Sequence, residues 1–294
     1  MDGRHSAPTF KVPAGACDCH MHVFGPLDRY PPSPTRSYTP REASLADYDR
    51  MTAVVGLQRL VLVQASAYGT DNSCLLDTLK AAGPRARGVA VIDDATTDAE
   101  LATLNAAGVR GVRVNAETFG VSSAAEIERM LAPTIDRVGP LGWHVQLFAS
   151  LAAIADLAPM LRAMALPLVI DHMGLAKGPL GPDQPGFNAL LSLVGNGAWV
   201  KVSGAYRVSS DEPSFPDAAP IAKALIVANP DRIVWGSDWP HTGKHANARL
   251  NETPVIEYRP LDDGALLSLL ATWADEATVK KVLADNPAAL YGFS

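Results

Sequence analysis

Two histidines separated by one residue, His20 and His22, lie near the start of this 294-residue chain, within Cys17-Asp18-Cys19-His20-Met21-His22. Alternate residues of a β-strand face the same side, so a strand here would present both imidazoles together, with Asp18 beneath them. Cys17 and Cys19 would then face away and fill the core. Two imidazoles held so close can polarise a carbonyl group or bind a metal ion. The spacing therefore predicts the start of a catalytic or metal-binding site.

The residues that could complete such a site come late in the chain. His172 ends the apolar run 166–172, and Asp238 follows the run 232–236. A carboxylate beside a water molecule can act as a general base, and we expect the mouth of the fold to raise the pKa of Asp238 toward neutrality. His20, His22 and Asp238 could alternatively be the three protein ligands that a catalytic Zn²⁺ normally has, beside a water.

Other polar residues at the predicted strand ends are candidates for substrate binding. Arg113 lies between Val112 and Val114 on an otherwise apolar strand, where a charge must be paired or functional. Its guanidinium suits a carboxylate or sulfonate, and an internal ion pair is the structural alternative. The remaining candidates are Arg207, Tyr38, Ser66, Gln146 and His241.

Short apolar runs alternate with predicted helices along the chain. The expected strands are 17–23, 59–66, 88–93, 111–115, 143–148, 166–172, 198–204 and 232–236. The expected helices are 44–55, 71–82, 97–107, 123–138, 151–164, 187–194 and 218–228, with the tail 275–293 as a helix packed on the outside. This alternation predicts a single-domain, distorted (β/α)8 TIM barrel, which collects its active site at the carboxyl ends of the strands. No Gly-x-Gly-x-x-Gly opens a helix after a strand, which disfavours the alternative of an open dinucleotide-binding sheet.

The remaining features bound the setting of the protein. Residues 1–15 are predicted to form a loose arm before a barrel that spans 16–294, and the prolines within 24–41 predict a semi-rigid loop over the site. The net charge of −6, without a Lys/Arg cluster, disfavours nucleic acid as a partner. Three cysteines and the absence of a long apolar run predict a cytoplasmic protein with no membrane partner. Nothing in the sequence indicates the oligomeric state.

The motifs resemble the amidohydrolase superfamily (amidohydrolase family 2), and within it the group around 2-pyrone-4,6-dicarboxylate hydrolase, sulfomuconolactone hydrolase and galactarolactone isomerase. The matching stretches are 19–26, 64–66, 69–72, 111–113, 169–174 and 234–241. The resemblance implies that Asp238 takes a proton from water while His20, His22 and His172 polarise a lactone carbonyl. It also implies that Arg113, Arg207, Tyr38 and Ser66 hold carboxylates.

Three positions depart from that pattern or bear on the metal. A second arginine of the family, six residues after Arg113, is replaced by Phe119, and a tyrosine of strand five is replaced by Phe148. The loss of one cation favours a lactone with fewer or different anionic groups over a dicarboxylate. Gln146 stands where many metal-dependent relatives carry a ligand. Because the lactonase branch includes members that work without metal, the resemblance implies that Zn²⁺ could bind but is not required.

The sequence therefore predicts a hydrolase that opens the ring of a small anionic lactone with water activated by Asp238. Pyrone carboxylates, muconolactones and sugar-acid lactones are all candidate substrates. Three alternatives stay open: lactone isomerisation by the same groups, a metal-dependent decarboxylase, and a barrel that binds an acidic metabolite without converting it.

Overall fold

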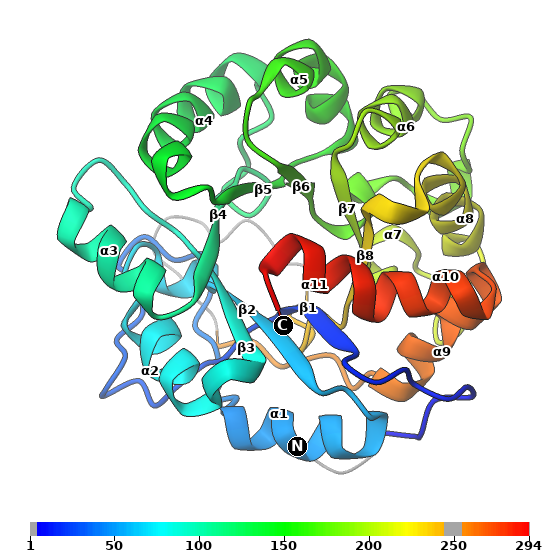
Figure 1. Ribbon diagram of the computed structural model, residues 1–294, viewed down its shortest axis with the longest axis horizontal. Helices are drawn as coiled ribbons and strands as arrows, with labels where there is room; N and C mark the ends of the chain where they lie inside the picture. Colours follow the sequence, from blue (N-terminus) through cyan, green and yellow to red (C-terminus); the bar gives the residue numbers. More distant parts are fainter. Residues whose placement is uncertain (1–4, 244–254, 294) are drawn as a thin grey trace.

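Parallel strands form the centre of the protein, which a computed structural model describes over residues 5–243 and 255–293 (Figure 1). Residues 1–4 of the predicted arm, and 244–254 and 294 of the predicted barrel, lie outside the described residues. The strands are β1 (Cys17–Met21), β2 (Arg59–Val63), β3 (Ala86–Ala90), β4 (Val109–Asn115), β5 (His144–Phe148), β6 (Leu168–Ile170), β7 (Trp199–Ser203) and β8 (Ile233–Gly236). Each strand pairs in parallel with the next in sequence.

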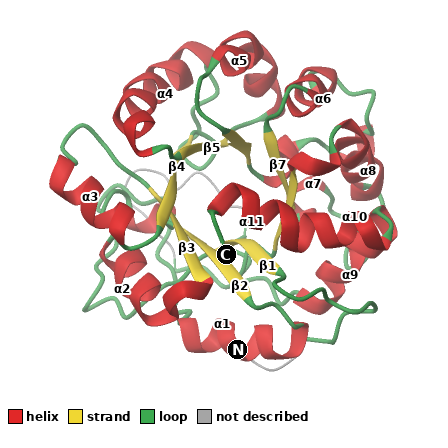
Figure 2. Ribbon diagram, in the orientation of Figure 1, coloured by secondary structure: helices red, strands yellow, loops and turns green. Residues whose placement is uncertain are grey.

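Helices surround this sheet, most of them on its outer side and the last over one end of the barrel, as Figure 2 shows. They are α1 (Leu45–Val55), α2 (Ser73–Ala82), α3 (Asp98–Ala106), α4 (Ala124–Val138), α5 (Leu151–Ala163), α6 (Phe187–Gly195), α7 (Ala205–Val208), α8 (Ala218–Ala228), α9 (Asp263–Trp273), α10 (Glu276–Lys280) and α11 (Asn286–Tyr291). Local sequence starts several of them. Ser44 with Asp47, and Thr97 with Glu100, form capping boxes that satisfy the first free N–H groups of α1 and α3.

The sheet closes on itself where the chain after β8 meets β1. The N–H of His22 donates to the carbonyl of Trp239 over 2.9 Å, and the N–H of Asp238 donates to the carbonyl of His20 over 2.8 Å. The predicted (β/α)8 barrel, distorted and formed by one domain, is thereby confirmed. Because closure joins β1 to the end of β8, it also brings His20 and His22 beside Asp238.

The end of the chain closes the bottom of the barrel. Tyr291 and Phe293 are buried in one cluster with inward-facing strand residues such as Val61 and Val89. The ring of Tyr291 lies 5.3 Å from that of His144, at the first position of β5. Figure 1 shows α11 and the C-terminus over the centre of the barrel. The expectation that the whole tail packs on the outside is therefore wrong for its last turn, because these two aromatic side chains fill the amino end of the barrel.

The described part of the N-terminal arm is fastened to the barrel. The N–H of Ser6 donates to Asp262 over 2.9 Å, and that of Thr9 donates to Ser268 over 3.0 Å. A side chain at Gly264 would meet the carbonyl oxygen of Ser6 at 1.7 Å, so the arm runs directly over α9. The expectation of a loose arm is wrong for these residues.

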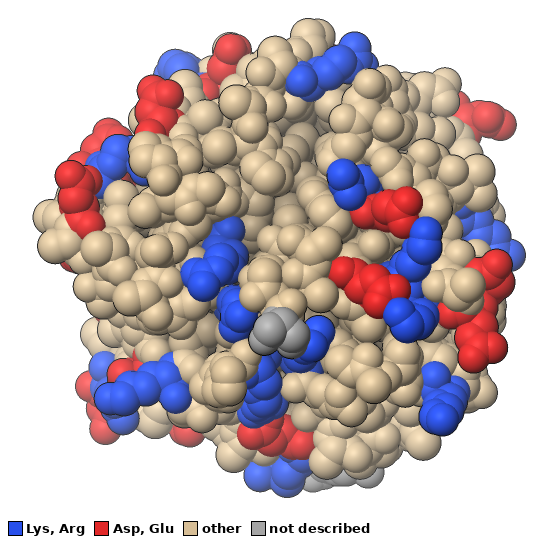
Figure 3. Space-filling view, viewed as in Figure 1, with Lys and Arg blue, Asp and Glu red and all other residues tan. Residues whose placement is uncertain are grey.

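Acidic and basic side chains alternate over the face seen in Figure 3, where a group of basic side chains lies near the centre. Arg59 and Arg87 are both placed over the ring of Phe293 at that end of the barrel, with guanidinium carbons 5.3 and 4.6 Å from the ring centre. The two guanidinium groups thus cover the ring of Phe293, which helps to fill this end of the barrel. Among the described residues, no helix is both long enough and apolar enough to span a membrane.

Candidate active site

An irregularity in β1 decides where its polar side chains point. The pairing of β1 with β2 shifts register between Asp18 and Met21. Asp18 accepts a hydrogen bond from the hydroxyl of Tyr48 on α1 (3.1 Å) and from Ser237 Oγ (2.5 Å), whereas His20 faces the barrel interior. The expectation that Asp18 lies beneath the histidines on one face is therefore wrong, because strict alternation does not hold across a bulge.

Cys17 and Cys19 are fully buried core residues, as predicted, but their direction differs from the expectation. Both lie in the cluster that fills the barrel interior, with Val61, Val169 and Val234. The structure thus places these thiols below the histidines within the barrel, where burial raises the pKa of Cys17 well above its ordinary value.

The backbone brings Asp238 to the histidines at some conformational cost. Asp238 and His172 both adopt left-handed backbone conformations, with φ of 62° and 48°. Such conformations are rare for residues other than glycine and gather at functional sites. Gly236 permits the close approach of β8 to β1, because a Cβ there would lie 2.6 Å from the Cβ of His20.

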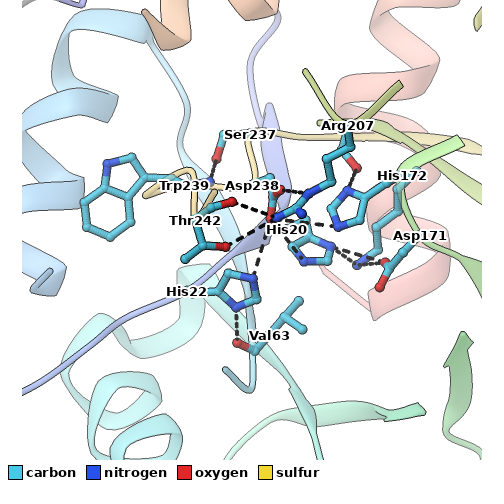
Figure 4. Close-up of polar contacts among 12 residues, drawn as sticks. His20, His22, Val63, Asp171, His172, Arg207, Ser237, Asp238, Trp239 and Thr242 are labelled. Carbon is cyan, nitrogen blue, oxygen red and sulfur yellow. Dashed lines mark hydrogen bonds and ion pairs between the residues drawn. The ribbon is translucent and has the colours of Figure 1, made fainter. Parts of the chain in front are cut away.

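Three imidazole nitrogens converge on one carboxylate oxygen (Figure 4). Asp238 Oδ1 lies 3.6 Å from His22 Nε2, 3.7 Å from His20 Nε2 and 3.9 Å from His172 Nε2. Asp238 Oδ1, His20 Nε2 and His172 Nε2 are buried without a hydrogen-bond partner among the described residues. Since buried polar atoms are nearly always paired, this convergence marks a position for a water, an ion or a substrate atom.

Contacts of the other ring nitrogens, and of the second carboxylate oxygen of Asp238, hold these side chains in place. His22 Nδ1 lies 2.8 Å from the carbonyl oxygen of Val63, and His172 Nδ1 lies 2.9 Å from Ser203 Oγ. Asp238 Oδ2 accepts from Arg207 Nε and from the hydroxyl of Tyr206, each over 2.5 Å. The geometry leaves Oδ1 of Asp238 facing the histidines.

These surroundings set the charge of Asp238. Burial alone would raise the pKa of its carboxyl, but Arg207 and His172 outweigh burial and hold the pKa well below its ordinary value. The expectation of a pKa raised toward neutrality is wrong, because the sequence does not reveal that a guanidinium contacts this carboxylate. Burial lowers the pKa of His172 to about 3 and that of His20 well below its ordinary value. At neutral pH the site therefore combines the carboxylate of Asp238 with the uncharged imidazoles of His20 and His172.

Arg113 and Arg207, both predicted to bind substrate, lie close to one aromatic ring. Their guanidinium carbons lie 4.8 and 5.8 Å from the centre of the Phe148 ring. Arg113 Nε also contacts Asp171 Oδ2 over 2.9 Å, so the internal ion pair considered for this arginine exists. Phe148 is buried beside His172, whereas Phe119 is 48% exposed.

The other predicted substrate-binding residues are spread more widely. Ser66 Oγ is 3.5 Å from the buried hydroxyl of Tyr38, and burial raises the pKa of that phenol. His241 is buried, with its Nε2 3.2 Å from Asp263 Oδ2 and its ring centre 5.8 Å from that of Tyr206. The structure therefore brings Tyr38 and Ser66 together and places His241 apart from the three histidines that face Asp238.

A buried polar network lies beneath the histidines. Gln146 is fully buried, and its amide contacts Asp171 Oδ2 over 3.0 Å and Lys201 Nζ over 2.7 Å. Lys201 and Asp171 were not identified as site residues from the sequence. Lys201 nevertheless carries the signal that singled out Arg113, since it is a charge between Val200 and Val202 on an apolar strand.

Zinc fits this donor set by its chemistry and spacing. Two groups place their ligand atoms within 4.8 Å of one another: His20, His22 and Asp238, and His20, Asp171 and His172. Imidazole nitrogen and carboxylate oxygen are ordinary zinc ligands. Of the unpaired atoms, His20 Nε2 belongs to both groups, Asp238 Oδ1 to the first, and His172 Nε2 and Asp171 Oδ1 to the second.

The fold and the site define a β/α-barrel protein with histidines and an aspartate at the carboxyl ends of β1, β6 and β8, where such barrels carry their active sites. The chain belongs to the amidohydrolase family, whose model matches residues 17–293.

Curated relatives cover nearly the whole chain. A 2-pyrone-4,6-dicarboxylate hydrolase of Comamonas testosteroni is 36% identical over 97% of this chain and 93% of its own length. A 4-sulfomuconolactone hydrolase of Hydrogenophaga intermedia is 35% identical over 96% and 90%. A D-galactarolactone isomerase of Agrobacterium fabrum is 30% identical over 98% and 95%. The ligand-free crystal structure of an Agrobacterium tumefaciens protein matches with a TM-score of 0.83 and 30% identity, over 98% of this chain and 99% of that one.

Proposed function

We propose that this protein hydrolyses a small anionic lactone. The observation that carries the proposal is the convergence of His20, His22 and His172 on one oxygen of a buried, ionised Asp238. The hydrolases of pyrone dicarboxylate and sulfomuconolactone that the chain resembles act on anionic lactones, which supports the substrate class.

The proposed reaction begins with a water molecule held by Asp238. The carboxylate takes a proton as the water oxygen forms a bond to the lactone carbonyl carbon, and imidazole N–H groups stabilise the developing oxyanion. The ring C–O bond then breaks, and its oxygen takes up a proton. The product is a hydroxy acid, or a keto acid if the leaving oxygen belongs to an enol.

Two arginines would hold the anionic groups of the substrate. Arg207 lies next to Asp238, and both Arg207 and Arg113 lie near the ring of Phe148. Guanidinium groups match carboxylate and sulfonate oxygens well. Tyr38 and Ser66 would add hydroxyl contacts. Gln146 and His241, also predicted to bind substrate, would act from the buried network and from beside Tyr206.

The proposed reaction requires no metal, although the site could hold one. His20, His22 and Asp238 are the residues that would bind Zn²⁺. A bound zinc would supply a Lewis acid and lower the pKa of a bound water. The proposed setting is the cytoplasm, which the free thiols of Cys17, Cys19 and Cys74 support.

Lactone isomerisation is the second candidate, because a relative of 30% identity is a galactarolactone isomerase. There, a hydroxyl of the substrate would replace water as the attacking group. Turnover in ¹⁸O-labelled water separates the two reactions, since hydrolysis incorporates one solvent oxygen and isomerisation incorporates none.

The test is turnover of muconolactones, pyrone carboxylates and sugar-acid lactones, each with and without a chelator. We expect ring opening that survives chelation. Asp238→Asn should lower the rate by about 10²–10⁴-fold, as expected for loss of a general base. Unchanged turnover by a folded Asp238→Asn protein would refute the proposed role, and lactone binding without any conversion would favour a metabolite-binding protein.

A further inference from the structure

Lys201 lies beneath the site, and the reaction as proposed does not use it. Its side chain is fully buried in the barrel, with Nζ 2.7 Å from Gln146 Oε1 and 3.3 Å from His20 Nδ1. A lysine amino group has N–H donors and, when charged, no acceptor. With Lys201 in its ammonium form, Nδ1 of His20 is the acceptor in this contact.

Asp171 is the competing partner of the same nitrogen. Its Oδ1 lies 3.2 Å from His20 Nδ1, but that approach lacks hydrogen-bond geometry. Oδ1 has no hydrogen-bond partner among the described residues, whereas Oδ2 accepts from both Arg113 and Gln146. The geometry thus favours Lys201 over Asp171 as the partner of His20 Nδ1.

The partners of the two ring nitrogens decide what His20 presents to the site. In a neutral imidazole one nitrogen carries the proton and the other accepts. If Nδ1 accepts from Lys201, the proton is on Nε2, the atom that lies 3.7 Å from Asp238 Oδ1. His22 is arranged the opposite way. Its Nδ1 faces the carbonyl of Val63, which can only accept, so its Nε2 has the free lone pair.

We infer that Lys201 is a positioning residue that fixes His20 as a hydrogen-bond donor into the active site. This inference rests on the proposed function, in which His20 Nε2–H faces the lactone oxygen that becomes negative. His22 is then an acceptor, suited to the water. The two histidines of the His-x-His motif therefore differ in role, although they share one strand.

The same tautomer works against zinc at this position. A histidine that ligates metal almost always donates its other ring N–H to a carboxylate, a backbone carbonyl or a water. His22 meets this condition through Val63, but His20 faces an amino group. With Lys201 in place, His20 would offer Nε2 as a ligand only after the proton on that nitrogen is displaced.

The tautomer can be measured without substrate. Protein labelled with ¹⁵N in histidine is observed by NMR at neutral pH, and the His20 signals are assigned by their loss in His20→Gln. We expect protonated Nε2 and unprotonated Nδ1 for His20, and the reverse for His22. A proton on Nδ1 of His20, or on both of its nitrogens, would overturn the inference.

The role of Lys201 itself is tested with Lys201→Met, which removes the donor at similar length. We expect the His20 proton to move to Nδ1, toward Asp171, while the far-ultraviolet circular dichroism stays native. Zn²⁺ binding, measured by calorimetry, should become at least about 10-fold tighter, and lactone turnover should fall by about 10²–10³-fold. An unchanged His20 tautomer in Lys201→Met would overturn the assignment, even if zinc binds more tightly, because loss of a nearby positive charge alone favours a cation.

The matched control is Lys281→Met. Lys281 is an exposed lysine that contacts Asp231 on the outer surface, so this variant should change neither tautomer, zinc binding nor turnover. If no lactone is converted by any variant, the proposed function fails while the NMR result still decides the role of Lys201. If Lys201→Met does not fold, the spectrum of the unmodified protein still supports or overturns the inference.

Discussion

The ion pair between Arg207 and Asp238 should contribute measurably to stability. Arg207 Nε lies 2.5 Å from Asp238 Oδ2, in a place where the aspartate side chain is fully buried and that of the arginine is 15% exposed. Unit charges roughly 4 Å apart attract by about 4 kcal/mol at an effective dielectric constant of about 20. Removal of one partner of a buried pair typically costs about 3–5 kcal/mol. We expect Arg207→Met to lower the free energy of unfolding by that amount at pH 7.

The size of this loss should depend on pH in a defined direction. The folded pKa of Asp238 is depressed, so its pairing stabilises the protein above the unfolded value of about 4 and is lost as pH falls through the folded value. In Arg207→Met, burial is no longer opposed by the guanidinium, and the pKa of Asp238 should rise. The difference in unfolding free energy between the unmodified protein and Arg207→Met should therefore be largest near pH 7 and become smaller toward pH 4.

Urea unfolding at several pH values measures both effects. Arg50→Met is the control, because the side chain of Arg50 is 67% exposed in its ion pair with Asp47, and loss of this pair should cost less than about 1 kcal/mol. The loss of unfolding free energy in the double variant Arg207→Met/Asp238→Asn should be smaller than the sum of the losses in the two single variants. Deficits that are equal at pH 7 and pH 4.5, or strictly additive effects, would refute the reasoning.

Two further predictions concern residues that support the site. His144 is buried with a pKa lowered to about 3, so its neutral form stabilises the fold above pH 6.5, and this stability is lost as pH falls toward 3. Between pH 5.5 and 4, the free energy of unfolding should therefore fall less steeply with decreasing pH in His144→Leu than in the unmodified protein. The two slopes should differ by about 1.4 kcal/mol per pH unit, and equal slopes would contradict the prediction. Gly236→Ala should cost about 1–3 kcal/mol by overpacking and reduce lactone turnover, because the added carbon would lie 2.6 Å from His20 Cβ and 2.9 Å from its nitrogen. Unchanged stability and turnover in Gly236→Ala would contradict this prediction, because they would show that β1 can move away from the added carbon without cost.

The barrel could be predicted from the sequence because its signal is repeated along the chain. Apolar runs such as 59–66 and 198–204 are hydrophobic on both faces, as strands buried between a core and helices must be. The structure shortens them to Arg59–Val63 and Trp199–Ser203, since side-chain composition does not mark where pairing with a neighbour stops. Closure by Tyr291 depends on space left inside the barrel, which no local pattern reveals.

The histidines and Asp238 could be found because strand ends gather at one face of a barrel. Their partners could not. The bulge in β1 turns His20 away from Asp18, and this follows from pairing with β2 and not from the residues of β1. The contact between Arg207 and Asp238 joins a residue after β7 to one after β8, so the depressed pKa of Asp238 depends on tertiary structure alone.

The charges around the site favour the proposed anionic lactone over a bare divalent cation. Lys201, Arg113 and Arg207 bring three basic groups into contact with only two carboxylates, Asp171 and Asp238. Low pKa values keep both carboxylates ionised, and the imidazoles of His20 and His172 are uncharged at neutral pH. With Lys201 charged, these groups together are positive. A substrate anion would balance that charge, whereas Zn²⁺ would add to it in a buried place where repulsion is poorly screened. Charge balance and the tautomer inferred for His20 therefore both support the proposed chemistry, in which imidazole N–H groups and arginines would act without a metal.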